Sequence, residues 1–232
     1  MAVTQTTIMS DRDANARIKL GADINPDSPP AAVFDISPET ALHLLCTNVE
    51  RLAAFAENTG TDERSHTPLD PPDDALEIET VGLHVKGDGD AVDPARATGE
   101  AIQMAILAKK FLSKKVPPIT LRDYLLRLHK YCPMSTAVYL AASVYIAKMT
   151  VVEKVLQVLP KNMHRLVLAG VWVASKALED LSYAHSRVAK VGGVSELELS
   201  KLEISFCFLV DFELRVDERM LMDEALRPQS VE

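Results

Sequence analysis

The chain has 232 residues, of which 47% are apolar and 25% charged. This composition supports a globular core without disulfides or a structural metal. Its 33 acidic residues against 25 basic ones give a net charge of −8, which argues against nucleic acid as a partner. The three cysteines form no CxxC pair, so we expect a reducing, intracellular location in the cytoplasm or nucleus. No apolar run approaches the about 20 residues of a membrane span, and we expect no membrane association.

Composition also divides the chain into ordered and flexible parts. Residues 60–94 hold ten acidic residues, two basic ones and no aromatic. Such a segment buries too little apolar surface to offset an ordering entropy of roughly 1–2 kcal/mol per residue, so we expect a flexible acidic insert. We further expect disordered tails at 1–36 and 227–232, an N-terminal helix at 37–59 and a folded domain over 95–226.

The parts that we expect to be ordered contain sequence signals for the starts and ends of helices. Ser37 before Pro38 marks a helix start, and an apolar stripe then runs from Leu42 to Phe55. A second helix is predicted from Thr98, with Pro117 and Pro118 ending it, and four lysines are expected in its last turns, where cations complement the helix dipole. These lysines are Lys109, Lys110, Lys114 and Lys115.

Two later segments begin like capping boxes, because Thr120 and Ser195 are each followed three residues later by an acid. Two runs, Leu166–Ala174 and Ile204–Val210, are apolar on every side, which is typical of helices buried at the centre of a bundle. The sequence therefore predicts an all-α domain with two central helices.

Segments that partly match catalytic or metal-binding motifs lack the residues or the spacing that those motifs require. Gly170–Lys176 lacks the second glycine of a phosphate loop and lies in an apolar helix, and the turn at Asp88–Asp90 lacks the glycine and glutamate of a calcium loop. The six histidines form no HxH or HxxxH pair. We therefore expect no enzyme activity, no cofactor, no metal and no small-molecule substrate.

Two charged residues stand beside the most apolar segments. Lys176 follows the run Leu166–Ala174, and Glu203 falls within the apolar stripe of a later helix. Burying an unpaired charge costs several kcal/mol, so each side chain reaches solvent, or the two pair, or they await the polar groups of a partner. We expect both to be partly accessible and within reach of one another.

Five stretches of the chain resemble the cyclin box of the P/U-type cyclins, a single-box, phosphate-pathway-like group of fungi, plants and protozoa. The stretches are Phe111–Tyr131, Asn162–Arg165, Ala174–Lys176, Ala189–Gly193 and Leu199–Glu203. The Ala-Lys-Val-Gly-Gly turn before a Leu-x-x-Leu-Glu helix is specific to that group. The first of the stretches lacks the Met-Arg-Ala-Ile-Leu run by which cell-cycle cyclins recruit substrates, so that docking mode is not expected.

The resemblance implies a five-helix cyclin box around a buried central helix, with the helix at Pro38–Asn58 packed beside it. A short additional helix is expected within Leu181–Lys190. The five box helices are expected at Leu121–Tyr131, Pro133–Met149, Met163–Asp180, Glu196–Val210 and Asp217–Leu226.

The resemblance also implies the function of a regulatory subunit, which binds a cyclin-dependent kinase, positions its C-helix and activates it. In cyclins a lysine and a glutamate at the positions of Lys176 and Glu203 hydrogen-bond the kinase backbone. Asp180, one helical turn after Lys176, would pair with an arginine of the kinase activation segment, unless Glu179 and Asp180 are simply a solvated helix end. The remaining expected kinase contacts are apolar, at Val173, Cys207 and Phe212. The alternative is a helical scaffold that tethers a kinase or another partner without activating it.

Overall fold

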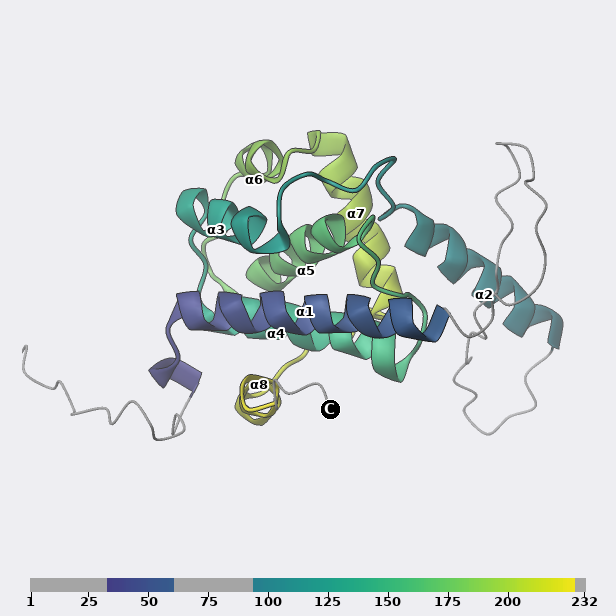
Figure 1. The fold of residues 1–232 in the computed structure, drawn as a ribbon, viewed down its shortest axis with the longest axis horizontal. Helices are drawn as coiled ribbons and strands as arrows, with labels where there is room; N and C mark the ends of the chain where they lie inside the picture. Colours follow the sequence, from purple (N-terminus) through teal and green to yellow (C-terminus); the bar gives the residue numbers. More distant parts are fainter. Residues whose placement is uncertain (1–32, 61–93, 228–232) are drawn as a thin grey trace, which may run out of the picture. The chain divides into compact units, whose positions relative to one another are not determined.

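The computed structural model describes residues 33–60 and 94–227, and in these two ranges it contains helices and no strand (Figure 1). The predicted all-α fold is thus confirmed for the described residues. The helices are η1 (Val33–Asp35), α1 (Pro38–Gly60), α2 (Pro94–Lys109), α3 (Leu121–Tyr131), α4 (Thr136–Ala147), η2 (Lys148–Val152), α5 (Met163–Leu178), α6 (His185–Gly192), α7 (Glu196–Leu209) and α8 (Glu218–Ala225).

Most of the N-terminal tail expected at 1–36, the interior of the insert expected at 60–94 and residues 228–232 lie outside the described ranges. The boundaries of these segments need correction where the structure describes them. Val33 and Ile36 are buried, so the ordered part begins before Ser37. Helix α1 continues to Gly60 and α2 begins at Pro94, so both ends of the expected insert are helical.

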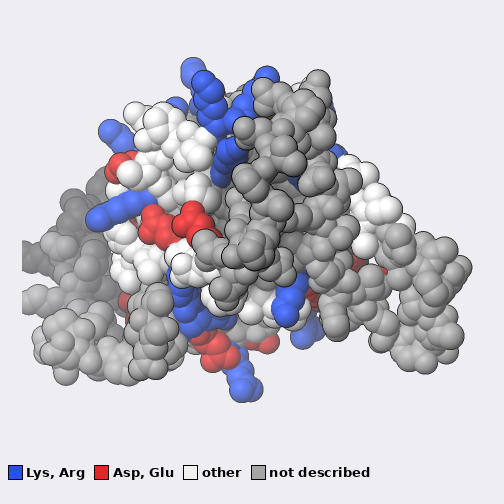
Figure 2. Space-filling model, turned by 45° about the vertical axis from the view of Figure 1, so that its right-hand side comes forward, with Lys and Arg blue, Asp and Glu red and all other residues white. Residues whose placement is uncertain are grey.

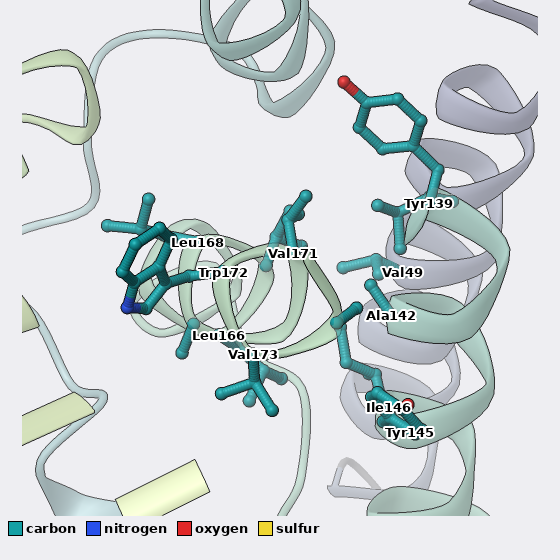
Figure 3. Close-up of a cluster of buried hydrophobic side chains, with 14 of the residues drawn as sticks. Val49, Tyr139, Ala142, Tyr145, Ile146, Leu166, Leu168, Val171, Trp172 and Val173 are labelled. Carbon is teal, nitrogen blue, oxygen red and sulfur yellow. The ribbon is translucent and has the colours of Figure 1, made fainter. Parts of the chain in front are cut away.

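Helix α5 is the centre of the fold, as its all-round apolar sequence predicts. It packs between α4 and α7, and every residue from Leu166 to Ser175 is buried. In Figure 3 its side chains point in several directions, with Trp172 turned away from the α4 residues Ala142 and Ile146. A helix that is covered on all sides fixes the positions of the helices around it.

Helix α4 begins later than predicted, at Thr136 rather than Pro133. Its N-cap is Ser135, whose extended backbone presents an N–H that donates to Glu179 Oε1 at 3.0 Å. The second carboxylate oxygen of Glu179 accepts from the Ser175 hydroxyl at 2.9 Å. Glu179 therefore joins the end of α5 to the start of α4, and it is not the solvated helix end that the sequence left open.

The N-terminal helix α1 packs along α4 beside the box, as expected. Its apolar stripe is buried at Leu42, Leu45 and Val49. Phe55 is exposed, so the prediction that the stripe stays buried this far along the helix is wrong. The Ser37 cap is confirmed, since the Ser37 hydroxyl accepts from the Thr40 N–H at 3.1 Å.

Helix α2 ends at Lys109, well before Pro117. Only Lys109 of the four lysines is therefore helical, and Lys110, Lys114 and Lys115 follow it as exposed residues. The explanation of this basic set by the helix dipole is wrong for those three lysines, because the dipole acts only within the last turn.

Helix α7 is not a second central helix, and that prediction is wrong. One of its faces packs on α5 and others meet α2 and α6, but Ile204 is 55% exposed and Phe208 is also exposed. The capping box at its start is confirmed by the reciprocal bonds between Ser195 and Glu198. The apolar residues that the sequence gives to every side of α7 thus leave an uncovered apolar face.

The last helix, α8, is held by a buried carboxylate that sequence reasoning missed. Glu224 is 1% exposed. Its Oε1 accepts from Asn48 Nδ2 of α1 at 2.8 Å and from the Ser143 hydroxyl of α4 at 2.5 Å. The Arg227 guanidinium lies 2.8 Å from Oε2, so the charge is compensated as well as hydrogen-bonded. Glu224 lies three residues after Leu221, the other buried residue of α8. This spacing, which puts both residues on one face of the helix, is the sequence signal by which the burial of Glu224 could have been found.

A buried histidine lies between α3 and α5. His164 Nε2 is 2.9 Å from the Ile119 carbonyl oxygen, and its ring packs edge-on against Tyr124. Burial lowers the pKa of His164 below its ordinary value, and hydrogen bonds with the backbone at Ile119 and Thr120 oppose this shift only in part. The folded chain therefore favours the neutral imidazole.

We predict that Glu224→Ala lowers the free energy of unfolding by about 3 kcal/mol, because the polar groups of Asn48 and Ser143 lose their shared acceptor. Asp223→Ala, a change of the neighbouring exposed carboxylate, is the matched control and should cost about 0.5 kcal/mol or less. Urea denaturation of both variants measures the difference. Equal losses would show that the buried network does not hold α8.

We predict that His164 makes the chain less stable in mild acid. Its pKa is lower in the folded state than in the unfolded one, so its stabilising contribution is complete above the unfolded pKa of about 6.5 and is lost as the pH falls toward the folded pKa. His164→Gln keeps a donor for the Ile119 carbonyl and does not titrate. Its melting temperature should fall less than that of the native chain between about pH 7 and pH 5, and parallel curves would contradict the assignment.

Candidate functional site

Lys176 and Glu203 meet where the C-terminal end of α5 crosses α7. Lys176 Nζ donates to Glu203 Oε1 at 2.5 Å, and the two side chains are 45% and 21% exposed. The expectation that they are partly accessible and within reach of each other is confirmed. Neither charge is isolated in the core, so the cost of burying a lone charge does not arise.

Trp172 fixes this pair in place. Its indole N–H donates to Glu203 Oε2 at 2.7 Å, and its ring lies under Lys176 Nζ, 5.4 Å from the ring centroid. Both carboxylate oxygens of Glu203 thus have a partner within the chain. Trp172 lies one helical turn before Lys176, so helix periodicity is the signal by which the contact with Lys176 could have been found.

Cys207 lies one turn after Glu203 on α7 and belongs to the same cluster. Burial raises the pKa of its thiol first, the nearby Glu203 carboxylate raises it further, and the Lys176 ammonium opposes the rise. Val173, by contrast, is only 3% exposed. Its expected place on a contact surface is corrected to the core, because its side of α5 is covered by other helices.

Phe212 lies just beyond α7 and is 59% exposed. Both Asp211 and Phe212 have left-handed backbones, with φ of 53° and 54°. This conformation costs roughly 1–2 kcal/mol per residue outside glycine. The Phe212 N–H donates to the Cys207 carbonyl at 2.8 Å, and the Phe212 ring packs edge-on against Phe208 at 5.1 Å. The strained turn presents an aromatic pair to solvent, a feature that periodicity does not predict.

Asp180 does not lie on the helix that carries Lys176. Helix α5 ends at Leu178, and Glu179 already has an extended backbone, so the predicted alignment of Asp180 one turn after Lys176 is wrong. The side chain of Asp180 is exposed. The structure therefore brings together Lys176, Glu203 and Cys207, leaves Phe212 at the far end of α7 and puts Asp180 in the following bend.

Exposed apolar side chains also occur on the elements that carry the pair and next to them. On α7 these are Leu197, Ile204 and Phe208. Leu178 ends α5, and Leu181 follows three residues later. The neighbouring helix α2 adds Ile102 and Ile106. A charged pair amid such residues is typical of a surface that another protein covers. We call the surface made by Lys176, Glu203, Cys207 and the exposed residues of α7 the α5–α7 face.

Within the described ranges, no group of three or more His, Cys, Asp or Glu side chains is placed to hold a metal ion. No helix in these ranges is both long and apolar enough to cross a membrane.

The chain is similar in sequence to several known proteins. The family model described as Cyclin matches residues 39–214. PHO85 cyclin-7 of Saccharomyces cerevisiae is 28% identical over 232 residues, which cover 91% of this chain and 81% of that protein. Cyclin-U4-1 of Arabidopsis thaliana is 41% identical over 100 residues, and PHO85 cyclin-like protein psl1 of Schizosaccharomyces pombe is 39% identical over 105.

These last two matches cover 43% and 45% of this chain, and 50% and 43% of the relatives. The chain thus spans about half the length of several of its curated relatives, and most of one. The family model covers well over half of the chain and includes four of the five predicted box helices, α3, α4, α5 and α7, whereas the fifth, α8, follows the matched range. The chain therefore belongs to the cyclin family, in its P/U-type group.

Proposed function

We propose that this chain is the regulatory subunit of a cyclin-dependent kinase, which it binds through the α5–α7 face and activates by positioning the kinase C-helix. The observation that carries the proposal is the Lys176–Glu203 pair, held by Trp172 among exposed apolar side chains. Two of the relatives are named for PHO85, which supports a partner of this class. The chain would act inside the cell, in cytoplasm or nucleus, and carry out no reaction itself.

The pair has unused hydrogen-bonding capacity for such a partner. A carboxylate offers about four acceptor positions and an ammonium three donors, and the contacts with each other and with Trp172 use two and one of these. Backbone N–H and C=O groups of a kinase can take the remainder. On the free chain an exposed pair contributes little to stability, but once a partner excludes water the same groups contribute much more.

Cys207 and Phe212 are the apolar contacts that we retain from the expected set. Cys207 is half-buried beside the pair, and Phe212 is presented by the turn after α7. A contact of Asp180 with an arginine of the kinase rests on the family resemblance alone, because its helical alignment with Lys176 is lost.

The alternative is a scaffold that tethers a kinase without activating it. It would use the same surface, and it differs only in leaving the activity of the bound kinase unchanged. Purification of the kinase bound to this chain, followed by a phosphorylation assay with and without the chain, separates the two. Activation requires a rate increase on adding the chain, whereas a tether leaves the rate of a small peptide substrate unchanged.

We predict that Lys176→Ala and Glu203→Ala each weaken kinase binding by about 2–5 kcal/mol, because the remaining charge would be buried without its partner in the complex. The free chain should lose about 1 kcal/mol or less in Lys176→Ala, and about 1–3 kcal/mol in Glu203→Ala, because the buried Trp172 then loses the acceptor of its indole N–H. Isothermal titration calorimetry and urea denaturation give the two quantities. Glu203→Gln, which keeps an acceptor for Trp172, should bind better than Glu203→Ala.

Arg165→Ala is the matched control, since Arg165 and Glu198 form another ion pair between the same two helices, away from the proposed contact. It should leave kinase binding unchanged. If the Lys176 and Glu203 variants unfold the free chain while the folded fraction still binds fully, the pair is internal structure and the proposed surface is wrong.

A further inference from the structure

A groove between α3 and α6 gathers basic side chains that the proposed kinase contact does not use. Its volume is about 770 Å³, and α3 and α6 lie next to each other in the fold (Figure 1). Four of the seven residues that line it are cationic, and none is acidic. The cationic residues are Arg127, Lys130, Arg187 and Lys190. We call this site the α3–α6 groove.

This concentration of positive charge contrasts with the net charge of −8 of the whole chain. In the part of the chain that the structure describes, no carboxylate forms an ion pair with any of the four cations. The acid one turn before Arg127 is Asp123, and its carboxylate accepts from the Thr120 hydroxyl at 2.8 Å. Among the described residues, the positive charge of the groove is therefore not compensated by an ion pair. The face drawn in Figure 2 shows acidic side chains close to basic ones.

Helix dipoles explain only half of this charge. Lys130 and Lys190 lie in the last turns of α3 and α6, where cations are favourable. Arg127 lies in the middle of α3, and Arg187 is the third residue of α6, near the positive end of that helix, where a cation is unfavourable. Arg187 is accounted for by its hydrogen bonds to the Tyr131 carbonyl at the end of α3, which leaves Arg127 as the cation that neither a helix dipole nor a partner within the described part of the chain explains.

The guanidinium of Arg187 is already held in position. Its Nε and one terminal nitrogen donate to the Tyr131 carbonyl at 3.0 and 2.5 Å, and it lies over the Tyr183 ring at 5.1 Å from the centroid. A fixed donor loses little freedom when a ligand binds, which favours affinity. Lys130 similarly lies over the ring of Tyr131, at 5.6 Å.

The rest of the groove is apolar rather than polar. Leu126 and Tyr131 of α3 are exposed, and Val191 of α6 is half-buried. An inorganic anion makes no favourable contact with an apolar lining. A peptide with acidic and large apolar side chains matches both the cations and the apolar residues of the groove. We propose that the α3–α6 groove binds an acidic peptide segment of a partner protein, with carboxylates or phosphates at the four cations and an apolar side chain against Leu126 and Val191.

The test uses the full chain without a kinase, so its result does not depend on the proposed function. The probe is a fluorescein-labelled peptide of alternating glutamate and leucine, followed by fluorescence anisotropy. Companion peptides carry lysine for glutamate, alanine for leucine, or phosphoserine for glutamate. The glutamate–leucine peptide should bind, more weakly as salt is raised from about 50 to about 300 mM, and the lysine peptide should not bind. The phosphoserine peptide tells whether phosphate is preferred over carboxylate as the anionic group.

The variant Arg127→Glu combined with Lys190→Glu reverses two exposed charges and leaves the contacts of Arg187 intact. It should weaken binding of the acidic peptide by about tenfold or more. Arg122→Glu reverses one charge on an exposed residue of α3 outside the groove and should have little effect. Circular dichroism of both variants confirms that they remain folded.

Three results would overturn the proposal. One is no binding of the acidic peptide at low salt. Another is an equal loss of binding in the Arg122→Glu control, which would indicate diffuse charge attraction. The third is binding of an oligothymidylate as tight as that of the peptide, together with no loss when alanine replaces leucine, which would indicate a general polyanion site.

Discussion

The fold depends on covering one helix from all sides. Because α5 is apolar around its whole circumference, it is stable only where other helices surround it, and α4 and α7 pack directly on it. Gly170 allows the close approach, since a β-carbon there would lie 3.2 Å from the Phe206 ring and 3.5 Å from Ile146. As α5 leaves this core, Trp172 is still buried and Lys176 is already exposed. The place where the central helix emerges is thus also the place where the candidate site forms.

Much of this arrangement could be predicted from the sequence, for physical reasons that differ between elements. Helix α3 has the predicted bounds, Leu121–Tyr131, because the Thr120 cap and its apolar spacing are local signals. The buried state of α5 follows from its composition alone. The partial exposure of α7 does not follow from its composition. Composition specifies how apolar a helix is, but not how many of its faces are covered by other helices. Ile204 and Phe208 remain exposed, and no local pattern encodes which faces of a helix its neighbours will cover.

The candidate site, too, could be predicted from the sequence only in part. The meeting of Lys176 and Glu203 could be anticipated from the cost of isolated charge, but the indole of Trp172 between them depends on the crossing of two helices. The alignment of Asp180 with Lys176 was wrong because Glu179 leaves the helix to accept from Ser135, 44 residues earlier in the chain. The end of a helix is set by such distant partners as often as by its own residues.

Two carboxylates show how burial separates structure from recognition. Glu224 is closed off, and it receives bonds from Asn48 and Ser143 with Arg227 beside it. Glu203 is held as firmly, by Trp172 and Lys176, yet keeps a fifth of its surface open to solvent beside uncovered apolar residues. A network that is fully closed can only stabilise the chain that contains it. One that is rigid, charged and still partly open loses little freedom when a partner arrives, and this favours Glu203 over Glu224 as a group for recognition.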